Sequence, residues 1–139
     1  MNINHLLLID DDEVNNFLVE EILRETPLLG RFTVKLSGEE ALTYLENCAE
    51  GSLFPDLILV DLKMPQMDGF EFVEHYEQQF KAAHPQTQLM MLTSSLREAD
   101  KQQALSYPTV RNFLNKPLDD QKLQTIAKLF AENQLLLKG

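Results

Sequence analysis

Four apolar runs of the sequence are followed by residues that could take part in chemistry. Asp10–Asp12 follow the first run, and Asp61 follows the second. Thr93 follows the third run, and Lys116 comes shortly after the fourth. Carboxylates held close together repel one another unless a cation neutralises them, and oxygen ligands suit Mg²⁺ or another hard divalent ion. These residue types therefore indicate a metal site with a hydroxyl and an ammonium group beside it.

The same groups suit phosphoryl transfer. A Mg²⁺ ion held by one or two carboxylates keeps waters that phosphate oxygens can replace. A lysine and a hydroxyl can hold the remaining phosphate oxygens, and an aspartate can act as the nucleophile and form an acyl phosphate. Asp61 stands alone at the end of its run, which makes it the best candidate for this acceptor.

The elements that must position these groups are apolar runs of strand length. Four runs cover residues 5–9, 56–60, 88–92 and 110–114, and a weaker alternating run covers residues 32–36. A segment with helical spacing of apolar residues follows each run. Five β-α repeats predict a parallel sheet with helices on both faces. Ligands bind beyond the carboxyl ends of such strands, which is where the polar groups fall.

Apolar residues at spacings of three and four predict which side of each helix faces the sheet. Helix by helix, these residues are Val14, Phe17, Leu18 and Ile22; Ala41, Leu42 and Leu45; Phe72, Val73, Tyr76 and Phe80; Leu96, Ala99 and Ala104; and Leu123, Ile126, Ala127 and Phe130. Ser37 and Ser95, each followed three residues later by a glutamate, predict two helix starts, and Asp119 or Asp120 predicts a third.

Length and composition limit the possible classes of protein. The 139 residues fit one domain, and a net charge of −10 repels phosphate backbones and anionic lipid surfaces. No apolar run approaches the roughly 18 residues that span a bilayer, and the single Cys48 cannot form an intrachain disulfide. We therefore expect a cytoplasmic protein that binds neither nucleic acid nor membrane. His5, His75 and His84 show no metal-ligand spacing, and we expect them at the surface.

The motifs at the strand ends resemble those of the receiver domain of bacterial two-component response regulators. They are LLLIDDDE at the first strand, DLILVDLKMPQMDGFEF at the third, MMLTSS at the fourth and FLNKP at the fifth, in family order over nearly the whole length. The resemblance implies an α/β, flavodoxin-like (βα)5 fold with a doubly wound, parallel, five-stranded sheet in the order 2-1-3-4-5. It implies one receiver domain over residues 1–139, with its core at about residues 4–133 and no output domain.

The resemblance also implies the roles of individual residues at the metal site. Asp61 would be the phosphoryl acceptor, modified to 4-aspartylphosphate. With Asp10 and Asp11 it would bind Mg²⁺ or Mn²⁺, and the backbone carbonyl of Lys63 would complete the protein's share of the ligands.

Three further residues match positions that respond to phosphorylation in the family. Thr93 and Lys116 would contact phosphoryl oxygens, and Phe113 would be the switching aromatic. The Lys116–Pro117 bond would be cis. The sequence departs from the commonest pattern because Asn112 replaces a frequent glycine, and because Phe113 lacks the hydroxyl of the tyrosine that many members carry.

A protein of this kind would act by binding and would not be an enzyme, apart from catalysing its own phosphorylation and slow dephosphorylation. A sensor histidine kinase or a histidine phosphotransfer protein would supply the phosphoryl group. The face formed by the fourth helix, the fifth strand and the fifth helix would then bind an unknown downstream protein.

Three alternatives compete with this interpretation. Asp10–Val14 also fits the D-x-D-x-V pattern of haloacid-dehalogenase-type phosphatases, with Asp10 as nucleophile, but this hypothesis leaves DLKMPQMDG without a role. A receiver-like interaction module that needs no phosphate is the second, and the intact set of site residues argues against it. Third, each polar residue taken alone could be a solvated helix start, a turn or a surface cation. Their joint position at four strand ends argues against that reading.

Overall fold

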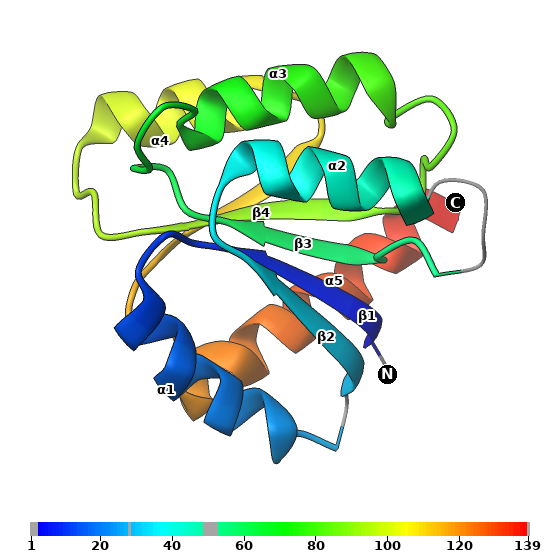
Figure 1. Cartoon of the computed structure of the whole chain (residues 1–139). Helices are drawn as coiled ribbons and strands as arrows, with labels where there is room; N and C mark the ends of the chain where they lie inside the picture. Colours follow the sequence, from blue (N-terminus) through cyan, green and yellow to red (C-terminus); the bar gives the residue numbers. More distant parts are fainter. Residues whose placement is uncertain (1–2, 28, 49–52, 139) are drawn as a thin grey trace.

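The computed structural model describes residues 3–27, 29–48 and 53–138, in which strands and helices alternate (Figure 1). In chain order the elements are β1 (Ile3–Ile9), α1 (Glu13–Arg24), β2 (Leu29–Lys35), α2 (Gly38–Cys48), β3 (Leu57–Val60), α3 (Gly69–Gln79), β4 (Gln88–Thr93), α4 (Glu98–Ser106), β5 (Val110–Asn115) and α5 (Asp120–Lys138). All neighbouring strands are parallel, in the order β2-β1-β3-β4-β5. This confirms the predicted flavodoxin-like topology.

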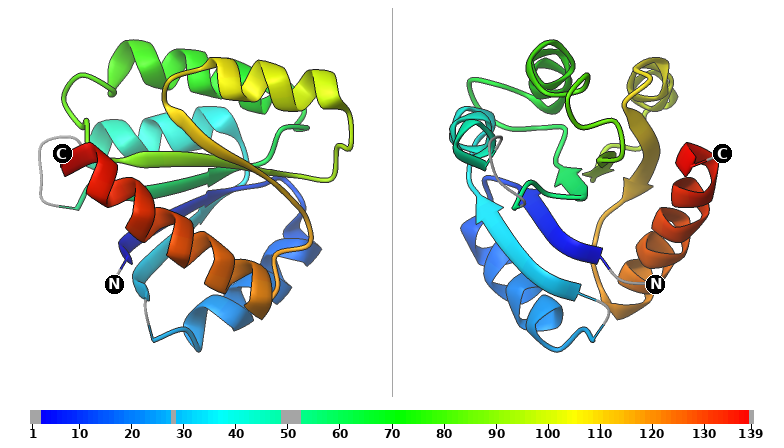
Figure 2. Two further views of the ribbon diagram at one scale, coloured as in Figure 1. Left: turned by 180° about the vertical axis from the view of Figure 1, so that it is seen from behind. Right: turned by 90° about the vertical axis from the view of Figure 1, so that its right-hand side faces the viewer.

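Helices cover both faces of the sheet, with α1 and α5 on one face and α2, α3 and α4 on the other (Figures 1 and 2). Successive side chains of a strand point to opposite faces. Leu7 and Ile9 of β1 therefore pack in the core under α2–α4, whereas Leu6 and Leu8 pack in the core over α1 and α5. A strand buried on both faces needs a continuous apolar run, which is the pattern seen in the sequence.

Strand register brings the polar strand ends to one level. Asp61 N–H donates to the carbonyl of Ile9 at 2.9 Å, so β1 and β3 end together. On the other side of β3, Lys116 N–H donates to the carbonyl of Thr93 at 2.8 Å, at the ends of β4 and β5. The carboxyl edge of the sheet therefore carries an aspartate after β3 and a lysine after β5, with β4 between them.

Helix α1 faces the sheet with a side that differs from the prediction. Three of the expected inward residues are exposed: Val14 (75%), Phe17 (62%) and Leu18 (59%). The buried residues are instead Asn16, Val19 and Leu23. The prediction chose the more apolar of two helical stripes and was wrong. The stripe that faces the sheet contains a polar residue, Asn16, whose amide donates to the backbone carbonyl of Asp10 inside the protein.

The predicted inward faces of α2, α3 and α5 are all buried, which confirms them. The prediction for α4 is wrong in two respects. Leu96 precedes the helix and is exposed, and Ala104 is the only buried residue of α4. Ser95 does not cap this helix, because α4 begins at Glu98 with Arg97 as its N-cap residue, and the Ser95 hydroxyl donates to Asp100 Oδ2 at 2.6 Å. The caps at Ser37 and Asp119 are confirmed by hydrogen bonds from backbone N–H groups three residues further on.

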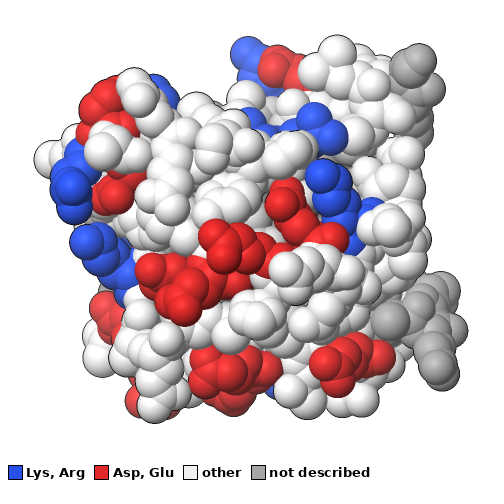
Figure 3. Space-filling view, turned by 90° about the horizontal axis from the view of Figure 1, so that it is seen from above, with Lys and Arg blue, Asp and Glu red and all other residues white. Residues whose placement is uncertain are grey.

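The face made by α2, α3 and α4 carries groups of acidic side chains, with smaller groups of lysine and arginine around them (Figure 3). Tyr107, the residue that directly follows α4, donates through its hydroxyl to Glu74 Oε2 of α3 at 2.6 Å. Since Ala104 is the only buried side chain of α4, few apolar contacts hold this helix to the sheet.

His5 lies inside the protein, with only 3% of its surface exposed, so its predicted surface position is wrong. The ring nitrogens are both hydrogen-bonded: Nδ1 to the carbonyl of Leu53 at 2.7 Å, and Nε2 to the hydroxyls of Thr33 at 3.0 Å and Tyr44 at 3.2 Å. Nδ1 therefore carries the proton, and Nε2 accepts. A histidine whose two nitrogens are both satisfied can be buried in its neutral form.

The start of the first strand and the end of the last helix lie at the same edge of the sheet. β1 begins and α5 ends at the edge opposite the strand ends that carry Asp10 and Asp61 (Figure 1). None of the described helices combines the length and apolar character needed to cross a membrane.

Candidate functional site

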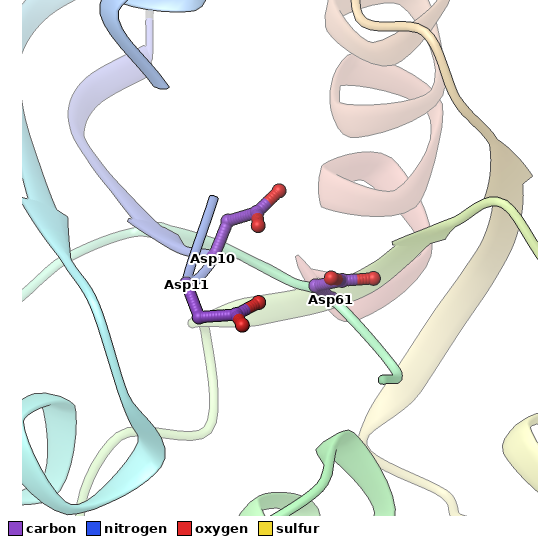
Figure 4. Close-up of side chains that lie close together, drawn as sticks. All are labelled: Asp10, Asp11 and Asp61. Atoms are coloured by element: carbon purple, nitrogen blue, oxygen red, sulfur yellow. The ribbon is translucent and has the colours of Figure 1, made fainter. Parts of the chain in front are cut away.

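The carboxylates of Asp10, Asp11 and Asp61 gather at the carboxyl ends of β1 and β3 (Figure 4). One oxygen of each residue lies within 4.8 Å of those of the other two. Asp10 and Asp61 are buried, whereas Asp11 is exposed. Three negative charges at this separation repel one another, so the cluster favours a neighbouring cation.

Lys116 places an ammonium group between two of these carboxylates. Its Nζ lies 2.5 Å from Asp10 Oδ2 and 3.3 Å from Asp61 Oδ2. The backbone of this segment is held by the hydrogen bond to Thr93, and the Lys116–Pro117 bond is cis, as the resemblance implies. The ends of three strands thus contribute to one charged site.

Burial changes the proton affinities of both charged partners. It raises the pKa of Asp61, and the nearby charge of Asp10 raises it further, while Lys116 acts in the opposite direction. Burial alone would lower the pKa of Lys116, but the hydrogen bond and charge of Asp10, together with Asp61, raise it. Lys116 therefore remains an ammonium ion beside Asp61, whose pKa is raised.

Residues at the start of α1 fix the position of Asp10. The N–H of Asp12 donates to Asp10 Oδ1 at 3.0 Å, and Asn15 Nδ2 lies 3.4 Å from Asp10 Oδ2. Asn16 Nδ2 donates to the backbone carbonyl of Asp10 at 2.7 Å. Neither asparagine was predicted from the sequence, although Asn16 is a polar residue in the same helical stripe as Val19 and Leu23.

The segment after Asp61 packs closely against the site. Gly69 N–H donates to the carbonyl of Leu62 at 2.8 Å, and a Cβ atom on Gly69 would lie 2.7 Å from the carbonyl oxygen of Asp61. Gln66 has a φ of 70°, and Met67 N–H donates to the carbonyl of Pro65 at 2.8 Å, which forms a tight γ-turn. Only glycine therefore fits at the start of α3 without moving Asp61.

The remaining predicted residues lie around the cluster. Thr93 is fully buried, and its Oγ1 accepts a hydrogen bond from Ser95 N–H at 3.1 Å. Phe113 is paired with Met91 in the sheet and packs, partly buried, against the core under α2–α4. The side chain of Lys63 is exposed. The structure thus brings Asp10, Asp11, Asp61 and Lys116 into one cluster, and Thr93 contacts it through the hydrogen bond from Lys116 N–H to its carbonyl.

A family model described as the response regulator receiver domain matches residues 6–128. The chain belongs to this family. It is a receiver domain of two-component systems, and the match runs from β1 into α5, so it includes every motif at the strand ends. Residues 129–138 of α5 lie beyond the matched range.

Curated relatives of this receiver domain include much longer proteins. The sensor histidine kinase CheAY of Helicobacter pylori is 28% identical over 123 residues, which cover 88% of this chain and 14% of that protein. The hybrid signal transduction histidine kinase B of Dictyostelium discoideum is 31% identical, over 91% of this chain and 7% of that protein. The receiver domain therefore spans only a small part of these two relatives. An uncharacterised 14.6 kDa protein of Leptolyngbya boryana is 31% identical, over 85% of this chain and 82% of that protein.

Solved structures similar to this receiver domain include response regulators of comparable length. A two-component response regulator from Cytophaga hutchinsonii superposes with a TM-score of 0.86 at 28% identity, and the match covers 95% of this chain and 99% of that one. A response regulator receiver protein from Dyadobacter fermentans gives a TM-score of 0.77 at 30% identity, with coverages of 91% and 96%. These similarities agree with the sheet order and the family match.

Proposed function

We propose that this receiver domain accepts a phosphoryl group on Asp61 from a histidine kinase or a histidine phosphotransfer protein, in a reaction that requires Mg²⁺ or Mn²⁺. The position of Lys116 carries the proposal, because its Nζ lies 3.3 Å from Asp61 Oδ2 while it also pairs with Asp10. An ammonium group in this position can pair with an oxygen of a phosphoryl group bound to Asp61. The kinases among the relatives support the choice of donor.

The donor set fits Mg²⁺ or Mn²⁺. Both ions prefer oxygen ligands, and Mg²⁺ is usually bound through one or two carboxylates while it keeps several waters. Asp10, Asp11 and Asp61 offer carboxylate oxygens within 4.8 Å of one another, and we assign the backbone carbonyl of Lys63 as a further ligand. When bound, the ion neutralises charge on the phosphoryl oxygens during transfer.

The proposed transfer exchanges one bond to phosphorus for another. A carboxylate oxygen of Asp61 forms a bond to phosphorus as the phosphorus–nitrogen bond of the donor breaks, and the donor's imidazole leaves with the electron pair. The hydroxyl of Thr93 and the ammonium of Lys116 each hold a phosphoryl oxygen. Slow attack by water on the acyl phosphate then releases inorganic phosphate and restores the Asp61 carboxylate.

An exposed apolar patch on α1, made of Val14, Phe17 and Leu18, is the proposed contact for the phosphoryl donor. It begins at Val14, three residues after Asp11, and its side chains are exposed to solvent. Glu13 and Glu21 are exposed on the same helix. The surface therefore fits a donor that presents apolar side chains with basic residues beside them.

Phosphorylation would be transmitted through Thr93 to α4 and β5. The added group carries a charge of about −1.5 to −2 and attracts the Thr93 hydroxyl, which now accepts a hydrogen bond from Ser95 N–H. A shift of Thr93 would change the space next to Phe113 on β5. Because α4 buries only Ala104, this helix can shift at low cost, and the face of α4, β5 and α5 would then bind a downstream protein differently.

The mass of the intact protein after incubation with acetyl phosphate and Mg²⁺ tests this proposal. We expect one added phosphoryl group in the wild type and none in Asp61→Asn, with no rapid turnover of phosphomonoesters. A phosphoryl group mapped to Asp10 would contradict the proposal and favour the phosphatase hypothesis. If neither acetyl phosphate nor a histidine kinase labels the wild type, the phosphate-independent module is the better interpretation.

A further inference from the structure

We propose that Asn16 is a positioning residue that orients the carboxylate of Asp11 for cation binding. The inference deepens the proposed function, because it concerns the cation site on which that function depends. Asn16 acts through the backbone, since its Nδ2 donates to the carbonyl oxygen of Asp10 at 2.7 Å. That carbonyl belongs to the peptide group that joins Asp10 to Asp11.

Packing does not explain an asparagine at this position. Asn16 is 3% exposed and lies in the inward stripe of α1 with Val19 and Leu23. Its Oδ1 has no hydrogen-bond partner among the described residues, and a buried acceptor without a partner destabilises the folded protein. An apolar side chain of similar size would avoid this cost and add apolar contact. The Nδ2 hydrogen bond to Asp10 is therefore the interaction that requires an amide here.

The orientation of the Asp11 carboxylate depends on the hydrogen bond from Asn16 more than that of the Asp10 carboxylate does. The carboxylate of Asp10 is held by Lys116 and by the N–H of Asp12. The carboxylate of Asp11 is exposed and makes no hydrogen bond or ion pair within the described part of the chain. Its direction toward the cluster is consequently set by the backbone at Asp10–Asp11, which Asn16 holds from inside the protein.

Magnesium binding measured by calorimetry on the whole chain tests this role. Asn16→Leu is expected to raise the Kd for Mg²⁺ about tenfold, the lower range for partners that orient metal ligands. Its Tm without Mg²⁺ should stay close to the wild-type value. Asn133→Leu is the matched control, because Asn133 on α5 also donates through its side-chain amide, to Gln88 on β4 and Asn112 on β5, and it should leave the Kd unchanged.

A double-mutant cycle identifies the residue through which Asn16 acts. If Asn16 orients Asp11, adding Asn16→Leu to Asp11→Asn should weaken Mg²⁺ binding little further, because the ligand that it positions is already altered. Additive effects, an unchanged Kd in Asn16→Leu, or an equal loss in Asn133→Leu would overturn the proposal.

A measurement without metal separates this inference from the proposed function. Amide hydrogen exchange at Asp11 and Asp12 in the metal-free protein should be faster in Asn16→Leu than in wild type, because the peptide group of Asp10–Asp11 loses its anchor. Unchanged exchange rates would overturn the role of Asn16 even if the protein is phosphorylated on Asp61. Wild-type protein that binds no Mg²⁺ would instead contradict the proposed function.

Discussion

The charge of Lys116 matters more than its size at this site. Its ammonium lies within 3.3 Å of two buried carboxylates, Asp10 and Asp61. No other ion pair is found for either carboxylate in the described residues. Removing one partner of a buried ion pair leaves an uncompensated charge, which is strongly destabilising.

Lys116→Met is therefore expected to lower the free energy of unfolding by about 2 kcal/mol at pH 7, which is less than for a fully buried ion pair because the Lys116 side chain is 19% exposed and solvent screens its charge. Without the cation, the pKa of Asp61 rises further above its already raised value, so the folded variant gains stability as the pH falls and the carboxylate is protonated. Urea unfolding at several pH values measures this. A loss of stability that is the same at pH 7 and in acid would show that packing, and not charge, causes it.

The buried His5 should make the free energy of unfolding depend on pH in the opposite direction to Asp61. Burial lowers the pKa of His5 below its usual 6.5, so the unfolded chain binds a proton on this residue more readily than the folded one. The free energy of unfolding should consequently decrease as the pH falls through 6.5 toward the folded-state pKa. In chemical unfolding between pH 7.5 and 5, His5→Gln should show a weaker decrease than wild type. His75→Gln, at an exposed position, should behave as wild type, and equal slopes for His5→Gln and wild type would refute the prediction.

At the scale of elements, α1 combines two functions on two sides. Its inward side packs on the sheet with Val19 and Leu23, and its outward side presents the patch of Val14, Phe17 and Leu18. Substitutions on the outward side affect no core contact and are expected to change stability by less than about 0.5 kcal/mol.

Phe17→Ser with Leu18→Ser should therefore slow phosphorylation by a protein donor while the rate with acetyl phosphate stays at the wild-type value. The reason is that only a protein donor would contact this surface. Initial rates of phosphoryl transfer with the two donors provide the measurement. A matched control is Leu135→Ser with Leu136→Ser, which removes two exposed leucines at the far end of α5. Equal slowing with both donors, or in the control, would exclude α1 as the docking surface.

The elements themselves could be predicted because each strand buried on both faces is a continuous apolar run. β2, an edge strand, alternates and begins at Leu29, before the expected residue 32. The orientation of α1 could not be predicted from hydrophobicity, since the stripe with Asn16 is the less apolar one. The inward face of α4 was predicted wrongly for a similar reason. This helix buries only Ala104, so its sequence has no clear apolar stripe.

The candidate site was largely predictable because its charged residues directly follow strands. Asp10, Asp61 and Lys116 come together as expected once parallel strands end at one edge. What the sequence could not supply was the register that pairs Asp61 with Ile9, or the contact of Asn16 with Asp10. Both depend on how elements distant in the chain are placed against one another.

At the scale of the whole molecule, the net charge of −10 makes cation binding favourable beyond the site itself. A ligand that binds only the folded state stabilises it according to its concentration relative to Kd. At free Mg²⁺ about 100 times the Kd the gain is about 2.7 kcal/mol, which corresponds to a Tm increase of roughly 9 °C for a domain of this size.

Thermal unfolding with and without Mg²⁺ measures this increase. NaCl at the same ionic strength controls for general screening of the acidic surface, and it should raise the Tm less. The variant with Asp10→Asn and Asp11→Asn should respond equally to the two salts. The same Mg²⁺-specific increase in that variant would place the binding site elsewhere on the protein.

The arrangement of the first and last elements has a practical consequence for measurement. β1 begins and α5 ends at the edge of the sheet opposite the carboxyl ends of β1 and β3 (Figure 1), which the three carboxylates follow. A chain immobilised on a sensor surface through either terminus would therefore hold its acidic edge toward the solution. Association of a candidate kinase could then be followed directly, and attachment through each terminus in turn would give two independent orientations for the same binding curve.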